Sequence, residues 1–342
     1  MNEYARSVQT QLLRRTYGRG VVDTDIPGWS LRCLQTSSGA LDGGARELHA
    51  EGVQLLEEHY RHVMTNHYGV AAPESIAFVF PVRMYSEGMF NGRTWNAGEF
   101  CVWNTNREFN AIAPPCDLLC LIVDRGMLAD YLLQTEHVEV EQSLRNYSFS
   151  VSSLQNDPPS VLRLVDLMEA SFDGHWDVTT SKAQQTVRQE VLETIAPFVI
   201  AQIDGDHYRR GYSCHTGLVR RARDVALSQM DAPLQVGELC RALNVSRRTL
   251  QESFQVVLGI SPLSYLRTLR LNGARRDLLA GHSVKEVTET WGFWHWSRFS
   301  QEYRRLFGEL PSATMRRVSP SNALERLAEL NTSFPSFPVA EQ

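Results

Sequence analysis

Residues 243–262 read LNVSRRTLQESFQVVLGISP, and residues 292–311 read GFWHWSRFSQEYRRLFGELP. The two stretches share one apolar pattern, and each matched position is displaced by 49 residues, as from Pro262 to Pro311. Apolar residues at i, i+4, i+7 and i+8 form one stripe of an α-helix, the glycine that follows is a typical C-cap, and the proline stops the helix. The sequence therefore predicts two copies of one helix with the same buried face and the same end.

Each copy begins upstream with a shorter helix, over residues 236–243 in the first and 284–291 in the second. Asn244 and Val245 form the predicted first turn with Ser246 as N-cap, and Ser283-x-x-Glu286 is a capping box. Two short helices joined by a tight turn are the outline of a helix-turn-helix, although a plain helical hairpin shares that outline. The duplication with matched caps favours the helix-turn-helix.

The exposed faces of the two second helices carry side chains suited to DNA. Arginine pairs bidentately with guanine, glutamine pairs with adenine, glutamate accepts from cytosine, and arginine also binds phosphate. A recognition helix presents its N-terminal residues to the major groove. The predicted DNA-facing residues are Ser246, Arg247, Arg248, Gln251 and Glu252, followed by Trp296, Ser297, Arg298, Ser300, Gln301 and Arg304. For Arg304, Arg305, Arg316 and Arg317 a solvated surface charge is an equal alternative.

The charge is distributed unevenly along the chain. Residues 217–318 contain 16 Lys+Arg and 9 Asp+Glu, a net charge of +7, whereas the whole chain has a net charge of −5. The remainder therefore carries −12. A basic C-terminal unit joined to an acidic remainder is typical of a DNA-binding module attached to a domain that does not bind DNA.

Residues 217–318 resemble the DNA-binding domain of the AraC/XylS family of bacterial transcription regulators. The resemblance is carried by Trp291-Gly292-Phe293, by residues 297–300, and by the run from Tyr303 to Ser312. Residues 243–250 and 292–295 are most similar to the branch that contains the ethanolamine-operon regulator.

The resemblance implies two helix-turn-helix units joined by a long helix over residues 262–279, with the two recognition helices about 34 Å apart in successive major grooves. It adds Arg267 and Arg270 of the joining helix to the DNA-facing set.

One segment departs from the family pattern. Trp294, His295 and Trp296 crowd the start of the second recognition helix, where the family usually has small polar residues. These aromatic side chains either contact thymine methyls or sugars, or pack on the joining helix. We therefore expect the first unit, with Arg248 and Gln251, to carry more of the base-specific readout.

The remainder of the chain is predicted to be a second domain of α+β character. Short apolar or alternating runs at 75–82, 98–103 and 118–123 indicate strands, and residues 47–68 are left open between helix and mixed structure. Residues 126–136, 160–173 and 183–203 are predicted helices, and the last two either form a homodimer, as the family implies, or only pack on the domain. The resemblance implies a cupin-like β-barrel or sandwich. The predicted organisation is a regulatory and dimerisation domain (1–203), a linker (204–216), an all-α DNA-binding domain (217–318) and a tail (319–342).

A small-molecule effector is implied by the resemblance, and Phe80, Tyr85, Trp95 and Trp103 are its candidate pocket, with filling of the core as the alternative. His59, His62 and His67 are the only histidine cluster, and residues 75–123 contain no histidine, so we expect no metal, no cofactor and no catalytic residue. The six cysteines show no disulfide or zinc spacing, which argues against a thiol-based DNA-repair protein.

No long apolar run or signal peptide is found, so we expect a cytoplasmic protein that does not enter membranes. Three functions remain open. The first is an effector-controlled transcription regulator, most simply an activator that binds promoter DNA and contacts RNA polymerase. The second is a regulator whose N-terminal domain serves only dimerisation or protein contacts. The third is a cupin-type enzyme fused to a DNA-binding module, which the missing metal ligands argue against.

Overall fold

The computed structural model describes residues 13–18, 29–147, 149–153, 158–204, 214–230 and 234–317. The predicted tail lies outside these residues, as does most of the predicted linker, because α5 ends at Asp204 and α6 begins at Cys214. The predictions for these two segments stay untested.

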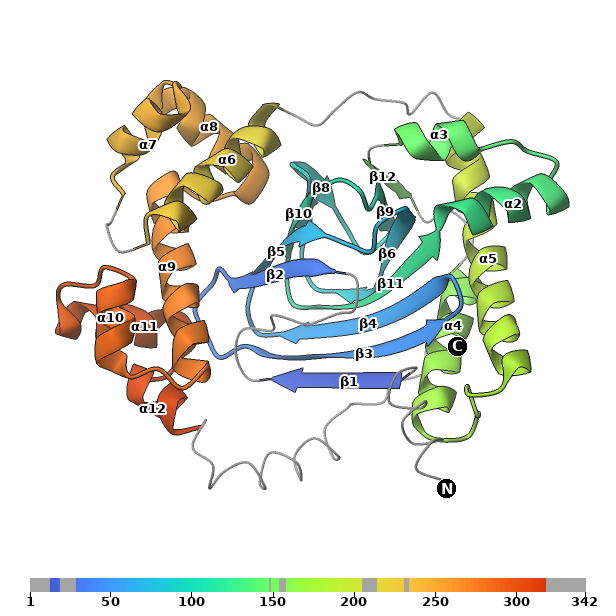
Figure 1. Cartoon of the computed structure of the whole chain (residues 1–342), viewed down its shortest axis with the longest axis horizontal. Helices are drawn as coiled ribbons and strands as arrows, with labels where there is room; N and C mark the ends of the chain where they lie inside the picture. Colours follow the sequence, from blue (N-terminus) through green and yellow to red (C-terminus); the bar gives the residue numbers. More distant parts are fainter. Residues whose placement is uncertain are drawn as a thin grey trace.

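Twelve strands in the described residues form two antiparallel sheets (Figure 1). The seven-stranded sheet has the order β1-β3-β4-β11-β6-β9-β12 and comprises β1 (Leu13–Gly18), β3 (Asp42–Ala50), β4 (Val53–Arg61), β11 (Cys116–Asp124), β6 (Ser75–Met84), β9 (Glu99–Asn104) and β12 (Phe149–Ser153). The five-stranded sheet has the order β2-β5-β10-β7-β8 and comprises β2 (Ser30–Gln35), β5 (Thr65–Val70), β10 (Phe109–Ala113), β7 (Gly88–Phe90) and β8 (Arg93–Trp95).

The predicted strands at 75–82, 98–103 and 118–123 are confirmed as β6, β9 and β11. Residues 47–68, left open by the sequence, form strands and the turns between them. Of the two alternatives, barrel or sandwich, the barrel is wrong for the described residues, because the strands form two separate sheets that pack face to face and do not close into one barrel. Closure is unnecessary for the seven-stranded sheet because both of its faces are covered, as the side-chain alternation of its central strand shows.

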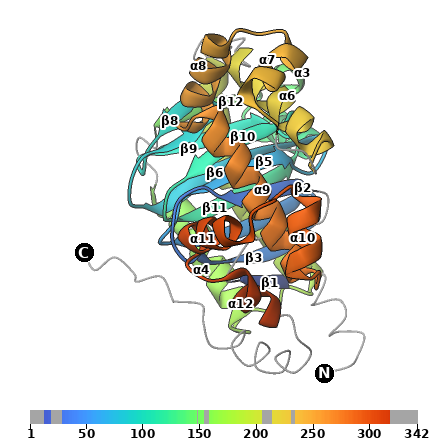
Figure 2. The same cartoon turned by 90° about the vertical axis from the view of Figure 1, so that its left-hand side faces the viewer.

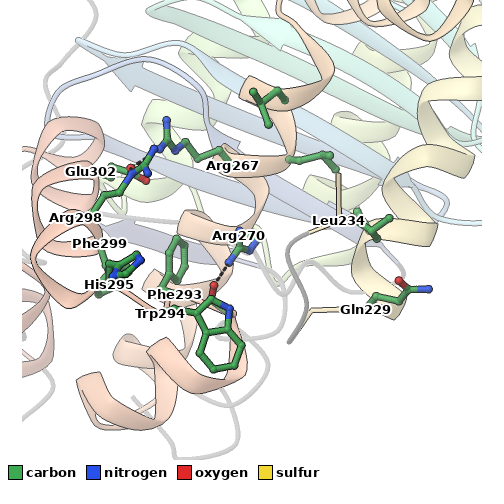
Figure 3. A pocket seen from close by; sticks show the side chains of 14 residues that line it. Gln229, Leu234, Arg267, Arg270, Phe293, Trp294, His295, Arg298, Phe299 and Glu302 are labelled. Atoms are coloured by element: carbon green, nitrogen blue, oxygen red, sulfur yellow. Dashed lines mark hydrogen bonds and ion pairs between the residues drawn. The ribbon is translucent and has the colours of Figure 1, made fainter. Parts of the chain in front are cut away.

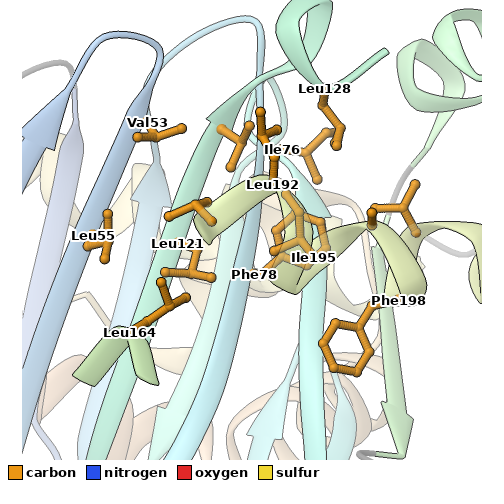
Figure 4. Close-up of a cluster of buried hydrophobic side chains, with 14 of the residues drawn as sticks. Val53, Leu55, Ile76, Phe78, Leu121, Leu128, Leu164, Leu192, Ile195 and Phe198 are labelled. Atoms are coloured by element: carbon orange, nitrogen blue, oxygen red, sulfur yellow. The ribbon is translucent and has the colours of Figure 1, made fainter. Parts of the chain in front are cut away.

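The central strand β11 supplies both faces of the seven-stranded sheet. Leu119, Leu121 and Val123 point to one face, while Cys116 and Cys120 point to the other, because successive side chains of a strand alternate. The first face is covered by helices α2 (Arg125–Thr135), α4 (Pro158–Phe172) and α5 (Ser181–Asp204), whose apolar stripes meet the sheet (Figure 4). The second face packs against the five-stranded sheet.

The helical domain lies beside the free face of the five-stranded sheet (Figure 1). It comprises α6 (Cys214–Ser228), α7 (Val236–Leu243), α8 (Arg247–Leu258), α9 (Pro262–Leu279), α10 (Val284–Thr290), α11 (Trp296–Phe307) and α12 (Pro311–Arg316). Figure 2 shows α9 running between the group α6–α8 and the group α10–α12. The molecule therefore has four layers: helices α2, α4 and α5, the seven-stranded sheet, the five-stranded sheet, and the helical domain.

Candidate nucleic-acid interface

The first helix-turn-helix unit is built from α7 and α8 as the sequence predicts. Asn244 ends α7 in the left-handed conformation (φ 53°), and the Ser246 hydroxyl accepts a hydrogen bond from the amide of Thr249 at 3.0 Å. The stripe that begins at Leu250 and Phe254 is buried, and Gly259 ends α8 with φ 68°. Positive φ favours glycine, which explains why a glycine follows the apolar stripe in both copies.

The second unit repeats this construction in α10 and α11. The Ser283–Glu286 capping box is present at the start of α10. Phe299 and Tyr303 are buried in α11, which ends at Gly308 with φ 74°, and Pro311 begins α12. The matched stripes therefore bury the same face of both second helices and leave the opposite face to solvent.

The solvent face of α8 carries the predicted reading residues. Arg247, Arg248, Gln251 and Glu252 are all exposed. Arg248 donates from Nε to Glu252 Oε1 at 2.7 Å, and this hydrogen bond holds the pKa of Arg248 above its usual value. An exposed pair at i,i+4 contributes little to stability, so both side chains remain available to another partner.

The solvent face of α11 is also accessible. Ser297, Arg298, Gln301 and Arg304 are exposed, while Ser300 is half-buried. Trp294 is 72% exposed and Trp296 is 53% exposed, so neither packs on α9. Phe293 lies against α9 instead, with its ring centre 4.5 Å from the guanidinium of Arg270 and 4.7 Å from the ring centre of Phe299. The packing alternative for the two tryptophans is therefore wrong.

The arginines of α9 are already engaged within the domain. Arg267 pairs with Glu302, which also accepts from Arg298 Nε at 2.8 Å. Arg270 donates to the carbonyl oxygens of Trp291 at 2.8 Å and Gly292 at 2.6 Å.

The guanidinium of Arg270 also lies 4.5 Å from the ring centre of Phe293. Burial lowers its pKa from the ordinary value. Arg270 therefore holds the turn between α10 and α11.

A groove of about 350 Å³ lies between the end of α6 and the second unit (Figure 3). The end of α6 and Leu234 lie on one side of it, the turn around Trp294 and His295 lies on the other, and Arg267 and Arg270 of α9 lie between them. Glu302 was missed by the sequence prediction. A carboxylate spaced four residues from Arg298 was the available signal for Glu302.

The four candidate effector residues are not brought together. Phe80 lies in the core beneath the helices, Trp95 and Trp103 lie between the two sheets, and Tyr85 is 61% exposed. Phe80 and Trp103 belong to neighbouring strands but point to opposite faces of the sheet. The buried indole Nε1 atoms of Trp95 and Trp103 have no hydrogen-bond partner among the described residues.

The predicted dimer helices use their apolar stripes inside the domain. Leu164 and Met168 of α4, with Val191 and Ile195 of α5, are buried against the seven-stranded sheet. Of the three clustered histidines, His59 lies on β4, His62 lies in the turn after it, and His67 lies on β5. Within the described part of the chain, no group of three or more His, Cys, Asp or Glu side chains is arranged to hold a metal ion. None of the described helices is long and apolar enough to span a bilayer.

Comparison with known proteins places the similarity in this helical domain. Residues 239–317 match a family described as a helix-turn-helix domain. The chain is 41% identical over 106 residues to the "Probable thc operon regulatory protein" of Rhodococcus erythropolis, covering 30% of this chain and 32% of that protein. It is 26% identical over 133 residues to the "XylDLEGF operon transcriptional activator 2" of Pseudomonas putida, covering 38% of this chain and 85% of that protein.

Among solved structures, the chain is similar to a probable AraC family transcriptional regulator from Rhodopseudomonas palustris. The identity is 28% and the TM-score is 0.28, over 30% of this chain and 99% of that one. The chain spans about a third of the length of the R. erythropolis relative that it matches.

Proposed function

We propose that the chain is a sequence-specific transcription regulator of the AraC/XylS type that reads promoter DNA with two helix-turn-helix units. One observation carries the proposal: α8 and α11 have matching buried stripes and caps on a shared helix, α9, and both expose arginine and glutamine near their N-terminal ends. Arginine and glutamine are the side chains that pair bidentately with guanine and adenine in the major groove.

In this proposal the two recognition helices make different kinds of contact with DNA. Arg248 and Gln251 supply hydrogen bonds to base edges, whereas Trp296 offers an apolar surface to a thymine methyl. Ser246, Arg247, Arg298 and Arg304 contact phosphates and fix the register on the duplex. Arg270 acts indirectly, because its guanidinium supports the backbone of the turn before α11.

The N-terminal domain is proposed to regulate this activity. The proposed signal is a small-molecule effector bound by this domain. The proposal also includes dimerisation through the outer surfaces of α4 and α5 and activation through RNA polymerase. It further includes a cytoplasmic location and kinship to the ethanolamine-operon branch.

The test is selection of duplexes from a random library by the full-length protein, followed by fluorescence anisotropy on the enriched sequence and a shuffled duplex. We expect the enriched duplex to bind at least a thousandfold more tightly at physiological salt. Equal affinity for both duplexes would refute the proposal. Mapping of bound genomic sites then identifies the target genes, and a thermal-shift screen of metabolites identifies the effector.

A further inference from the structure

The five-stranded sheet holds the first helix-turn-helix unit by an apolar core. Leu34, Tyr68 and Ile112 of the sheet belong to the same buried cluster as Leu218 and Phe254 of the helical domain. Arg223 of α6 is 4% exposed, pairs with Glu108, and lies 3.9 Å from the centre of the Tyr68 ring. An apolar interface of this kind resists relative motion of the parts that it joins.

The second unit has an apolar core of its own. In the described part of the chain, the buried cluster around Trp291, Phe299 and Tyr303 draws all of its members from residues 227–315. Gly308 of this unit lies close to Gly39 and Ala40 of the sheet domain. This unit and the second half of α9 also form hydrogen bonds with that domain. These contacts centre on Gln35, Asn272 and Leu306.

Asn272 occupies an unusual position for its residue type. It lies inside α9, where asparagine is a poor helix former, and it is fully buried. Its Oδ1 accepts from the backbone amide of Gln35 at 2.9 Å, and its Nδ2 donates to the Gln35 carbonyl at 3.0 Å. Because β2 is an edge strand of the five-stranded sheet, Asn272 stands where the backbone of a further strand would pair.

The carbonyl of Leu306 completes the contact. The last four carbonyls of a helix have no partner within that helix, and Leu306 lies in the last turn of α11. It accepts from the Gly39 amide at 3.0 Å and from the side-chain amide of Gln35. The same amide of Gln35 donates to the carbonyls of Ser37 and Gly39, which fixes the segment between β2 and β3. The end of the second recognition helix is thus capped by the N-terminal domain.

We propose that Gln35 and Asn272 are positioning residues for DNA binding, forming a polar latch that holds the second helix-turn-helix unit in register with the first. The first unit stays on the sheet through its apolar core, whereas the second unit is released when the latch opens. The inference rests on the proposed function, and it makes the segment between β2 and β3 the route by which the N-terminal domain controls two-site binding.

The latch is tested first without DNA, by hydrogen exchange and mass spectrometry of the full-length protein. Asn272→Ala is expected to speed amide exchange at least tenfold in α11 and α12, while exchange in α6 and α8 is unchanged. Gln35→Ala is the second variant, and it should give the same pattern. Asn104→Ala is the matched control, because the buried Asn104 amide donates to the carbonyls of Leu144 and Arg145 inside the N-terminal domain. Faster exchange in both units alike, or in neither, would overturn the latch.

DNA binding supplies the second readout. The probes are the library-selected duplex and a version with the bases under α11 shuffled. Asn272→Ala should weaken binding to the intact duplex about tenfold and leave the shuffled duplex unaffected, because loss of a fixed register lowers the effective concentration of the second unit. An equal loss on both duplexes, or no loss, contradicts a positioning role. If the wild-type protein selects no duplex, the proposed function fails, and the exchange experiment still decides the latch.

Discussion

Trp291 packs directly over Gly273, so that a Cβ atom at position 273 would lie 2.1 Å from the indole ring. The indole Nε1 also donates to Asp277 Oδ2 at 2.6 Å, which fixes the ring against α9. Gly273 therefore permits the close approach of α9 to the end of α10. The contact joins the shared helix to the second helix-turn-helix unit.

Gly273→Ala is expected to destabilise the helical domain by about 1–3 kcal/mol, because the ring must move and overpacking of a filled core costs that much. The gain in helix propensity from glycine to alanine, about 1 kcal/mol, is too small to compensate fully. Urea denaturation followed by tryptophan fluorescence measures the change. Gly237→Ala in α7 is the control, because nothing lies within 4 Å of a Cβ there, and it should stabilise or be neutral. Equal effects of the two substitutions would contradict the packing explanation.

The recognition helices should respond unequally to substitution. Arg248→Ala combined with Gln251→Ala is expected to abolish selective binding, since each bidentate base contact contributes about 1–3 kcal/mol of discrimination. Trp296→Ala should weaken binding less, because an exposed indole offers only apolar contact to a thymine methyl. Anisotropy titrations on the selected and shuffled duplexes give the ranking. A larger loss of selectivity from Trp296→Ala would reverse the proposed division of work.

The folded protein should be sensitive to acid through His67. Burial between the sheets lowers the pKa of His67 to about 4, from an ordinary value of 6.5. A lowered folded-state pKa gives stability that is fully present above pH 6.5 and is lost as the pH falls toward 4, because the unfolded chain binds the proton first. The expected loss is about 3 kcal/mol, from about 1.4 kcal/mol per pKa unit.

The measurement for His67 is urea denaturation at several pH values in this window for the wild type and for His67→Gln. The difference in unfolding free energy between the two proteins should decrease as the pH falls from 6.5 to 4, because glutamine does not titrate. A constant difference across this window would show that His67 does not become protonated on unfolding.

Local patterns in the sequence were sufficient for the two helix-turn-helix units and, in the sheet domain, for strands β6, β9 and β11 and helices α2, α4 and α5. Ser246 and Gly308 were predicted because a cap depends on neighbours within a few residues. The exposure of Trp294 was not predictable, because an aromatic run has the same pattern whether it packs or faces solvent. The pairing of Gln35 with Asn272 joins residues 237 positions apart and leaves no local signal.

The arrangement of the strands was not predictable from the sequence for a related reason. Alternation predicts that Phe80 and Trp103 lie on strands, but only the register between β6 and β9 shows that they point to opposite faces. The candidate pocket was therefore assembled from residues that do not share a cavity. The presence of two sheets in place of a barrel likewise depends on tertiary packing, which local sequence patterns do not show.

Glu302 shields positive charge in the groove between α6 and the second unit, since one carboxylate pairs with both Arg267 and Arg298. Glu302→Gln should therefore tighten binding to any duplex and steepen the dependence of log K on log salt concentration by about one, as for one added phosphate contact. Arg298→Ala should reduce that slope by about one and weaken binding evenly across sequences. Anisotropy at several salt concentrations on selected and shuffled duplexes measures both slopes. If Arg298→Ala instead removed selectivity at one base pair and left the slope unchanged, Arg298 would contact a base. The phosphate contact proposed for Arg298 would then be wrong.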